Sequence, residues 1–339
     1  MDGFSFTVCT RCFTYNHEAY IRDALVGFVL QKTDFPVVYV IVDDASLDKT
    51  AGIVTDFFKE DFNWEDCKTA YLKVSEWGTV SYAQHKTNKN CYFAIILLNE
   101  NHYQQGKSKF PYFAEWMDMS EFCAICEGDD YWTDPYKLQN QVEVLRKDET
   151  LMAVVTNSKV VDNTGNELKE RQLDIVPNNK EGRYDLRSFI YEVHRYPTAT
   201  VCYRNTHAKE IQRMVEHTKN PYLGDWTLWI VLHVFGDFYY LDRVTSAYRI
   251  NPTSLTHTVN RVGRSKAHWT ICRAVQEILP DEYSDIKHSL NKDSWMWSDL
   301  AMAYRHEHQY FRMLWCFLVS FVKNPGRLIR EFKKRLSNR

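Results

Sequence analysis

The chain has 339 residues, of which 45% are hydrophobic and 25% charged, and its formal net charge is -2. This length suffices for one large domain or two modest ones, each with a buried core. The near-neutral charge, and the lack of a basic patch interleaved with aromatic residues in the first 300 positions, argue against a nucleic-acid-binding protein.

The N-terminal residues MDGFSFTVCTRC do not resemble a secretory signal, because Asp2 is acidic and no apolar run precedes Arg11. No run in the chain reaches the ~20 apolar residues of a membrane span. We therefore expect a cytoplasmic protein, whose nine cysteines are free thiols.

Strand and helix signals alternate from the start of the chain. Residues 6–13 are rich in β-formers and end in the polar residues 14–17. Residues 18–31 then carry apolar side chains at helical spacing, which predicts a helix packed on one face. The nearly continuous apolar run 37–42 is typical of a parallel strand buried on both faces. Polar residues from Ser46 onward offer N-caps for a second helix through Phe58, so the order predicts a βαβ architecture.

The rest of the chain gives fewer regular signals. Strands are expected at 69–74 and 121–126, and the long, polar and aromatic stretch between them is expected to contain a loop at 99–109 near the functional site. A helix is expected over 134–147, short strands and turns after 150, and a helix over 206–217. We predict one α/β domain over residues 1–255 and a helical C-terminal extension over 256–339.

Polar residues follow three of the expected strands. Thr14 to Asn16 follow the first, Asp43 and Asp44 the second, and Glu127 to Asp130 the strand at 121–126. The carboxyl ends of parallel strands meet at one rim of a sheet, where ligands bind. Carboxylates gathered there without nearby basic residues would repel each other, which favours a divalent cation, Mg²⁺ or Mn²⁺, with a phosphate-bearing ligand. For either acid pair alone, turn and capping roles are the alternative.

Two Cys-x-x-Cys pairs, Cys9/Cys12 and Cys123/Cys126, raise the alternative of a zinc site. Both pairs lie in expected strands, where a spacing of three sends the two thiols to opposite faces. We therefore expect these cysteines to be small buried hydrophobic residues in neighbouring strands.

Five segments together resemble a known family: FTYNHEAYI, VIVDDASLDKT, CEGDDYWTDPYKLQNQV, GDWTLWIVL and YLDRVTSAYRI. Over about residues 4–257 the chain resembles the family 2 glycosyltransferases, particularly bacterial enzymes of surface polysaccharide synthesis, such as capsule and lipopolysaccharide. The resemblance implies a GT-A fold, a Rossmann-like mixed sheet flanked by helices. It also implies inverting transfer of a sugar from a nucleotide-sugar donor, which we expect to be UDP-linked, to a saccharide or lipid-linked acceptor.

The resemblance also implies roles for individual residues. It places Thr14, Tyr15, Asn16, Glu18, Asp43, Asp44 and Asp129 in the nucleotide-sugar site. It makes Asp130, together with Asp129, the metal ligand, and Asp225 the catalytic base. Glu127 stands where many relatives have Asp, so whether it reaches the metal is open, and for Asp225 a helix N-cap is the alternative role.

Two further residues are assigned near the end of the resembling region. Arg249, with its permanent charge and fork geometry, is expected at the donor diphosphate. Relatives carry a histidine shortly after the Tyr-Arg pair, where this chain has Asn251. His257 is the substitute candidate for the metal, with a structural or solvated histidine as the alternative.

The C-terminal tail is strongly basic. Residues 323–339 contain seven Lys or Arg and one Glu, and they follow the apolar run MLWCFLVSFV. This pattern predicts peripheral contact of residues 313–339 with the anionic inner face of the cell membrane. The alternative is a helix that packs its apolar side on the domain. At the level of function, a non-catalytic sugar-nucleotide-binding protein, a membrane-surface scaffold and a nucleotidyltransferase remain open.

Overall fold

The computed structural model describes residues 5–66, 70–192, 196–217, 224–251, 260–291 and 294–323. The chain divides into two compact units, one formed by Met1–Ala208 with Phe235–Asn251 and the other by Lys209–Val234 with Pro252–Arg339. The expected extension, 256–339, falls in the second unit, which also takes in 209–234. The boundary at 255 remains a prediction.

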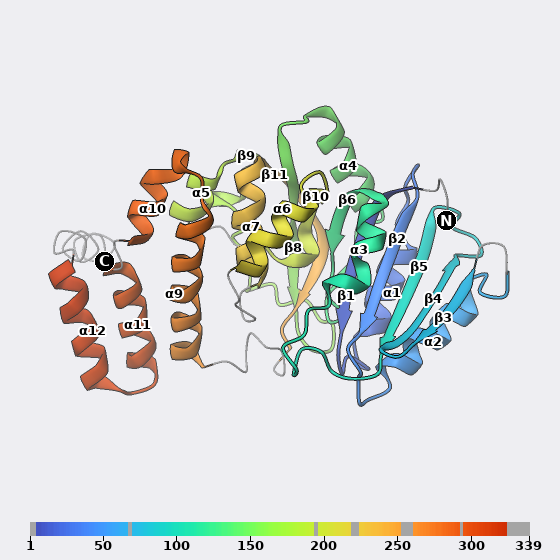
Figure 1. Cartoon of the computed structure of the whole chain (residues 1–339), viewed down its shortest axis with the longest axis horizontal. Coiled ribbons are helices and arrows are strands. Elements are labelled where there is room, and N and C mark those ends of the chain that lie inside the picture. Colours follow the sequence, from blue (N-terminus) through green and yellow to red (C-terminus); the bar gives the residue numbers. More distant parts are fainter. Residues whose placement is uncertain are drawn as a thin grey trace. The chain divides into compact units, whose positions relative to one another are not determined.

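The first unit is built on a mixed sheet, which contains eleven strands in the described part of the chain and has the order β3-β4-β5-β2-β1-β6-β10-β8-β11-β7, with β9 beside β11 (Figure 1). Its centre is parallel across β5, β2, β1 and β6, and the remaining pairings are antiparallel except that of β8 with β11. The strands are β1 (Phe6–Thr14), β2 (Val37–Asp43), β3 (Tyr71–Ser75), β4 (Gly78–Gln84), β5 (Cys91–Leu98), β6 (Ser120–Ile125), β7 (Tyr131–Trp132), β8 (Leu151–Val161), β9 (Gly182–Tyr184), β10 (Val201–Arg204) and β11 (Asp237–Arg249).

Helices cover both faces of this sheet. Helices α1, α2 and α4 contribute to one core cluster with the strands, whereas α3 packs on the other face, where Phe113 contacts Phe13 (Figure 1). Every residue of β2 is buried, as its continuous Val and Ile run predicted. The helices of this unit are α1 (Ile21–Val29), α2 (Thr50–Asp61), α3 (Phe110–Asp118), α4 (Lys137–Lys147) and α5 (Leu186–Tyr191).

No strand or helix was predicted within residues 75–118, where only the loop at 99–109 was expected. This stretch contains two strands, β4 and β5, and helix α3, and β5 is a buried central strand between β4 and β2. Its sequence CYFAIILL has the same continuous apolar character as β2. Strand β5 was missed because the whole stretch was described by its polar and aromatic residues, which flank this apolar run. The loop at 99–109 does join β5 to α3.

The cysteine interpretation is confirmed. Cys9 of β1 lies opposite Cys123 of β6, and all four cysteines of the two pairs are buried. Cys12 and Cys126 belong to the core cluster on the α1 face, together with the same-parity residue Val8. The two cysteines of each pair therefore point to opposite faces of the sheet, where they cannot chelate one ion together.

The second unit is helical. Its helices are α6 (Ala208–His217), α7 (Gly224–Phe235), α9 (Arg261–Ile278), α10 (Ser284–Asn291), α11 (Ser294–His306) and α12 (Tyr310–Lys323), with Ala208 and Phe235 on the first-unit side of the boundaries. A small core joins α9, α11 and α12 around Leu300, Tyr304 and Cys316. Among the described residues, no helix combines the length and the apolar character needed to cross a membrane.

Candidate functional site

The loops that follow β1, β2 and β6 meet at one rim of the sheet, as predicted. Thr14 pairs with Asp43 in the parallel register, and the amide of Asp44 donates to the Thr14 carbonyl at 3.0 Å. On the other side, the amide of Gly128 donates to the Phe13 carbonyl at 2.9 Å. A Cβ on Gly128 would lie 2.8 Å from the Thr14 hydroxyl, so this close approach of the acidic loop requires glycine.

The loops after β1 and β2 are joined by side chains that the sequence placed in the nucleotide site. The Asn16 amide donates to Ser46 Oγ at 2.9 Å, and Asn16 Oδ1 accepts from the Leu47 amide at 2.8 Å. Glu18 Oε2 accepts from the Lys49 amide at 3.0 Å. Asn16 adopts a left-handed backbone conformation, with φ 54°, which asparagine tolerates well. Asn16 and Glu18 thus hold the two loops together.

Asp43 is buried at the end of β2. Its carboxylate accepts from the Ser46 hydroxyl at 2.5 Å and from the Ser46 amide at 3.0 Å. Burial raises the pKa of Asp43, while these hydrogen bonds act in the opposite direction. Ser46, Asp48 and Thr50 were the expected N-cap candidates for α2. Ser46 instead serves the turn after β2, whereas Asp48 Oδ1 accepts from the amide of Thr50, the first residue of α2, at 2.9 Å.

Asp44 anchors the 99–109 loop. Its buried carboxylate accepts from the amides of His102 and Tyr103 at 2.7 and 3.1 Å, and forms an ion pair with Lys109 Nζ at 2.9 Å. The Asn101 side chain also donates to the Asp44 carbonyl at 3.1 Å. The loop therefore lies beside the acids after β2, and Asp44 is the residue that holds it there.

Asp130 lies in the loop after β6, and its carboxyl group is buried. Its Oδ1 accepts from the backbone amide of Arg249 at 2.8 Å. Burial is the main cause that raises the pKa of Asp130, and the neighbouring charges of Asp129 and Glu127 raise it further. The backbone amide and the charge of Arg249 act in the opposite direction.

Arg249 binds the same loop with its side chain. Nε donates to the Asp129 carbonyl at 2.9 Å, and Nη2 pairs with Asp23 of α1 at 2.7 Å. The guanidinium lies over the rings of Tyr20 and Tyr131, at 4.8 and 5.4 Å, and the side chain is only 2% exposed. In this structure Arg249 contacts protein, and its contact with a donor diphosphate remains a prediction.

Glu127 lies on the same rim, on the side of α3. Burial raises its pKa to about 7, and the charges of Arg11 and Lys109 act against that rise. The sequence analysis considered the acid clusters to lack basic neighbours, and this was wrong. Arg11, Lys109 and Arg249 reach them from distant parts of the chain, as the separation of 65 residues between Asp44 and Lys109 shows.

His17 is a site residue that the sequence analysis missed. Its Nδ1 lies 3.3 Å from the Thr14 hydroxyl, and a Cβ on Gly128 would lie 2.9 Å from the same nitrogen. Burial lowers the pKa of His17, and the charges of Asp129, Asp48 and Asp43 act to raise it. Its place directly after Thr-Tyr-Asn was the only signal in the sequence.

The acidic loop suits a hard divalent cation. Asp129 and Asp130 offer carboxylate oxygens, the ligands that Mg²⁺ and Mn²⁺ prefer, and the raised pKa of Asp130 marks a site that a positive charge would stabilise. Within the described ranges, no three His, Cys, Asp or Glu side chains gather as a ready metal site. Such ions commonly take only one or two carboxylates and complete their shell with water and substrate phosphates. His257 lies outside the described residues.

Asp225 belongs to the second unit, in the first turn of α7. Its Oδ1 accepts from the amide of the next residue, Trp226, at 2.8 Å. Helix α7 begins at Gly224, so Asp225 lies inside the first turn and this bond is not the N-cap bond to the second or third helical amide that the sequence offered as an alternative. The side chain retains contact with solvent, yet surrounding protein raises the pKa of Asp225 by desolvation. The catalytic role of this residue remains a prediction.

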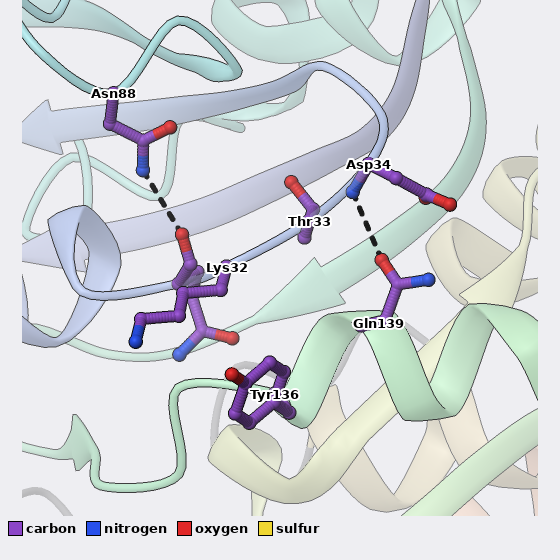
Figure 2. A pocket seen from close by; sticks show the side chains of 7 residues that line it. Lys32, Thr33, Asp34, Asn88, Tyr136 and Gln139 are labelled. Atoms are coloured by element: carbon purple, nitrogen blue, oxygen red, sulfur yellow. Dashed lines mark hydrogen bonds between the residues drawn. The ribbon is translucent and has the colours of Figure 1, made fainter.

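A second, polar groove lies away from the acids. It measures about 450 Å³ and is lined by Gln31, Lys32, Thr33, Asp34, Asn88, Tyr136 and Gln139 (Figure 2). These residues precede β2 and β5 or begin α4, so the groove lies at the opposite ends of the strands from the carboxylate rim. Its amides are engaged in holding the loop together: Asn88 donates to the Gln31 carbonyl, and Gln139 accepts from the Asp34 amide. We therefore place the candidate active site at the carboxylate rim.

Comparison with known proteins supports the fold. No protein-family model matches the chain. The uncharacterized proteins Mb1547 of Mycobacterium bovis and Rv1520 of Mycobacterium tuberculosis are each 36% identical to it over 132 residues, which is 39% of this chain and 29% of each relative. The match thus spans less than a third of the length of those relatives.

Solved structures match over most of the chain. TarS 1-349 from S. aureus in complex with UDP-GlcNAc matches with a TM-score of 0.57 and 17% identity, over 88% of this chain and 79% of TarS 1-349. The mannosyltransferase PcManGT from Pyrobaculum calidifontis, in complex with GDP-Man and Mn²⁺, matches with a TM-score of 0.51 and 13% identity, over 99% and 82% of the two chains. The chain therefore has the predicted glycosyltransferase fold of the GT-A type, a mixed sheet flanked by helices with further helices at its C-terminal end.

Proposed function

We propose that this protein is a family 2 glycosyltransferase, which transfers a sugar with inversion from a nucleotide-sugar donor to an acceptor hydroxyl. The observation that carries the proposal is the rim where Asp43 and Asp44 follow β2, and Asp129 and Asp130 follow β6, the two strands that lie parallel on either side of β1 in a GT-A-type sheet. The structural relatives that bind UDP-GlcNAc, and GDP-Man with Mn²⁺, support a nucleotide sugar as donor. We expect the donor to be UDP-linked.

The nucleotide is proposed to lie over the loops after β1 and β2. Thr14, Tyr15, Asn16, Glu18, Asp43 and Asp44 form this part of the site, and Asp129 meets the ribose. Asn16, Glu18 and Asp44 already hold neighbouring backbone amides, so they act on the nucleotide mainly by fixing the shape of the loops. Such prior fixing lowers the entropic cost of binding.

Asp130, with Asp129, is proposed to hold Mg²⁺ or Mn²⁺. A bound divalent cation stabilises the negative charge that develops on the departing nucleoside diphosphate. Arg249 holds the Asp129–Asp130 loop from below, and it remains a candidate for contact with the diphosphate. His257 is a further candidate ligand.

Asp225 is proposed as the catalytic base. Inversion by single displacement needs a carboxylate that takes the proton of the acceptor hydroxyl as its oxygen attacks the anomeric carbon. The raised pKa of Asp225 supports this role, since a stronger base accepts a proton more readily. Its Oδ1 is engaged with the Trp226 amide, so Oδ2 is the proposed proton acceptor.

The acceptor is proposed to be a saccharide or a lipid-linked sugar of surface polysaccharide synthesis, at the inner face of the cell membrane. Residues 1–255 form the transferase domain, and residues 313–339 contact the anionic leaflet. The basic composition of residues 323–339 supports this contact.

The test is a screen of UDP- and GDP-sugars with Mn²⁺, in which nucleoside diphosphate release is measured. Metal-dependent release that requires Asp225 would support the proposal. Release of pyrophosphate would instead identify a nucleotidyltransferase. Donor binding by the wild type without any turnover would leave only a sugar-nucleotide-binding protein, and equal turnover by the wild type and Asp225→Asn would rule out Asp225 as the base.

A further inference from the structure

Helix α12 exposes its bulkiest apolar residues. Phe311, Leu314, Trp315, Leu318 and Val322 follow the i, i+3, i+4, i+7, i+11 spacing of one helical face, and all are exposed, Phe311 to 92% and Trp315 to 63%. These five residues are called the α12 stripe below. A stripe of this kind on a surface marks a site of interaction, whereas single exposed apolar residues do not.

The opposite face of α12 is already used. Cys316 is buried in the small core with α9 and α11, Met313 and Phe317 pack against that core, and Ser320 Oγ lies 2.7 Å from Ser298 Oγ of α11. The inner face of α12 is thus occupied by contacts within the second unit. Because α12 is packed on α11 along one side, the helix can enter an apolar phase only with its outer side, lying flat, and the α12 stripe is the main apolar surface of that side.

The charges around the stripe are basic. Arg312 turns back toward α11, where its guanidinium lies 5.7 Å from the Tyr304 ring and Nη1 donates to Gln309. The only other charged residue of α12 is Lys323 at its end. From Tyr310 to Arg339 the chain carries eight Lys or Arg and one Glu. A protein partner with an apolar surface could carry charges of either sign. An apolar stripe flanked by basic residues matches an anionic lipid surface.

We propose that the α12 stripe inserts into the headgroup region of an anionic phospholipid bilayer, and that the basic residues after it supply a separate electrostatic attraction. This deepens the membrane contact of the proposed function and rests on it. The earlier proposal placed the contact in residues 313–339. The present one starts the inserted segment at Phe311, on a helix face of the folded second unit. The two contributions are separable: apolar insertion acts on any bilayer, whereas the basic residues act only on an anionic one.

The experiment uses the full chain and flotation with vesicles of phosphatidylcholine, alone or mixed with phosphatidylglycerol. The stripe variant is Leu314→Ser with Trp315→Ser and Leu318→Ser, and the tail variant is Arg330→Gln with Lys334→Gln and Arg335→Gln. The matched control is Leu72→Ser with Val74→Ser, two apolar residues of β3 with 69% and 74% exposure. Thermal unfolding of each variant checks the fold.

We expect the stripe variant to lose binding to both vesicle types by at least about tenfold, since three inserting apolar side chains are removed. The tail variant should lose only the preference for phosphatidylglycerol, and the control should bind like the wild type. The inference is overturned if the stripe variant floats like the wild type. It is equally overturned if the wild type does not float and the stripe substitutions abolish self-association instead.

Nucleoside diphosphate release without vesicles separates the two proposals. Loss of flotation with normal release leaves the transferase proposal standing, and flotation without any release leaves the α12 proposal standing.

Discussion

The backbone amide of Arg249 donates to Asp130 Oδ1 at 2.8 Å, and the guanidinium of the same residue donates to the Asp129 carbonyl at 2.9 Å. One residue at the end of β11 thus holds both acids of the loop after β6, although 119 residues separate Arg249 from Asp130. The arrangement fixes the backbone of the loop that carries both carboxyl groups.

Replacing Arg249 with Lys should destabilise this loop. A lysine cannot reproduce the guanidinium hydrogen bonds to Asp129, Asp23 and the turn at Asp162 and Asn163. Removing one member of a buried charged network lowers the free energy of unfolding by about 3 kcal/mol. Urea unfolding measures the loss. The matched control is Arg243→Lys, whose exposed pair with Asp134 should contribute less than about 1 kcal/mol. Unchanged stability with a raised KM for the donor would instead support the diphosphate contact predicted from sequence.

Replacing Asp44 with Ala should release the 99–109 loop. The substitution removes the acceptor for two amides and leaves Lys109 without its buried partner, which should cost about 2–3 kcal/mol. Limited proteolysis should then cut within the loop faster than in the wild type. Glu100→Gln is the control, since Glu100 pairs with Lys107 at an exposed position of the same loop. Equal cleavage rates of all three proteins would contradict the anchoring role.

Glu127 should make stability depend on pH. Because burial raises its pKa to about 7, the folded protein holds the proton more tightly than the unfolded chain. The resulting stability is present below the ordinary glutamate pKa and is lost as pH rises through about 7, by an amount on the order of 3 kcal/mol. Unfolding at about pH 5 and about pH 8, without metal or nucleotide, should show this loss in the wild type and not in Glu127→Gln. The same pH dependence in both proteins would sink the prediction.

Lys137 should act in the opposite direction, from inside the core. It is fully buried, its ammonium lies 4.5 Å from the Trp132 ring, and burial lowers its pKa to about 8. The folded protein therefore releases this proton more easily than the unfolded chain. Its contribution to stability is full above the ordinary lysine pKa and falls, by on the order of 3 kcal/mol, as pH drops toward 8.

Lys137→Met removes this titration and keeps the contact with Trp132. The variant should gain stability relative to the wild type at about pH 7.5, and this advantage should shrink at about pH 10. A constant difference between the two proteins across that range would show that the lysine does not change its protonation on unfolding.

The central fold could be predicted where one local pattern sufficed. The apolar runs of β1 and β2 and the helical spacing of α1 identified the βαβ start, and the parallel arrangement then placed the acids after β1, β2 and β6 on one rim. Strands β4 and β5 were missed. In the half-buried β4, apolar residues alternate with polar ones, and the apolar run of β5 lies between long polar stretches. The polar composition of the whole stretch was therefore given more weight than these local patterns.

The acids of the site could be predicted, and their partners could not. Asp43, Asp44, Asp129 and Asp130 follow strands directly, so sequence position alone locates them. Lys109 reaches Asp44 only through the tertiary fold, and no local pattern marks it. Arg249 was singled out from its motif, but its hydrogen bond to Asp130 depends on the tertiary fold as well. His17 was adjacent to a recognised motif, but its packing against Gly128 depends on the approach of β6 to β1.

Calorimetric titration of UDP in the presence of Mn²⁺, beside an assay of UDP-sugar turnover, tests the glycosyltransferase assignment most directly. We expect the wild type to bind UDP and turn over a donor. Asp225→Asn should retain UDP binding and lose turnover by at least about 100-fold, because only the base is removed. Asp130→Asn should lose metal-dependent binding as well. Equal donor turnover by the wild type and Asp225→Asn, or no binding of any nucleotide sugar by the wild type, would contradict the assignment.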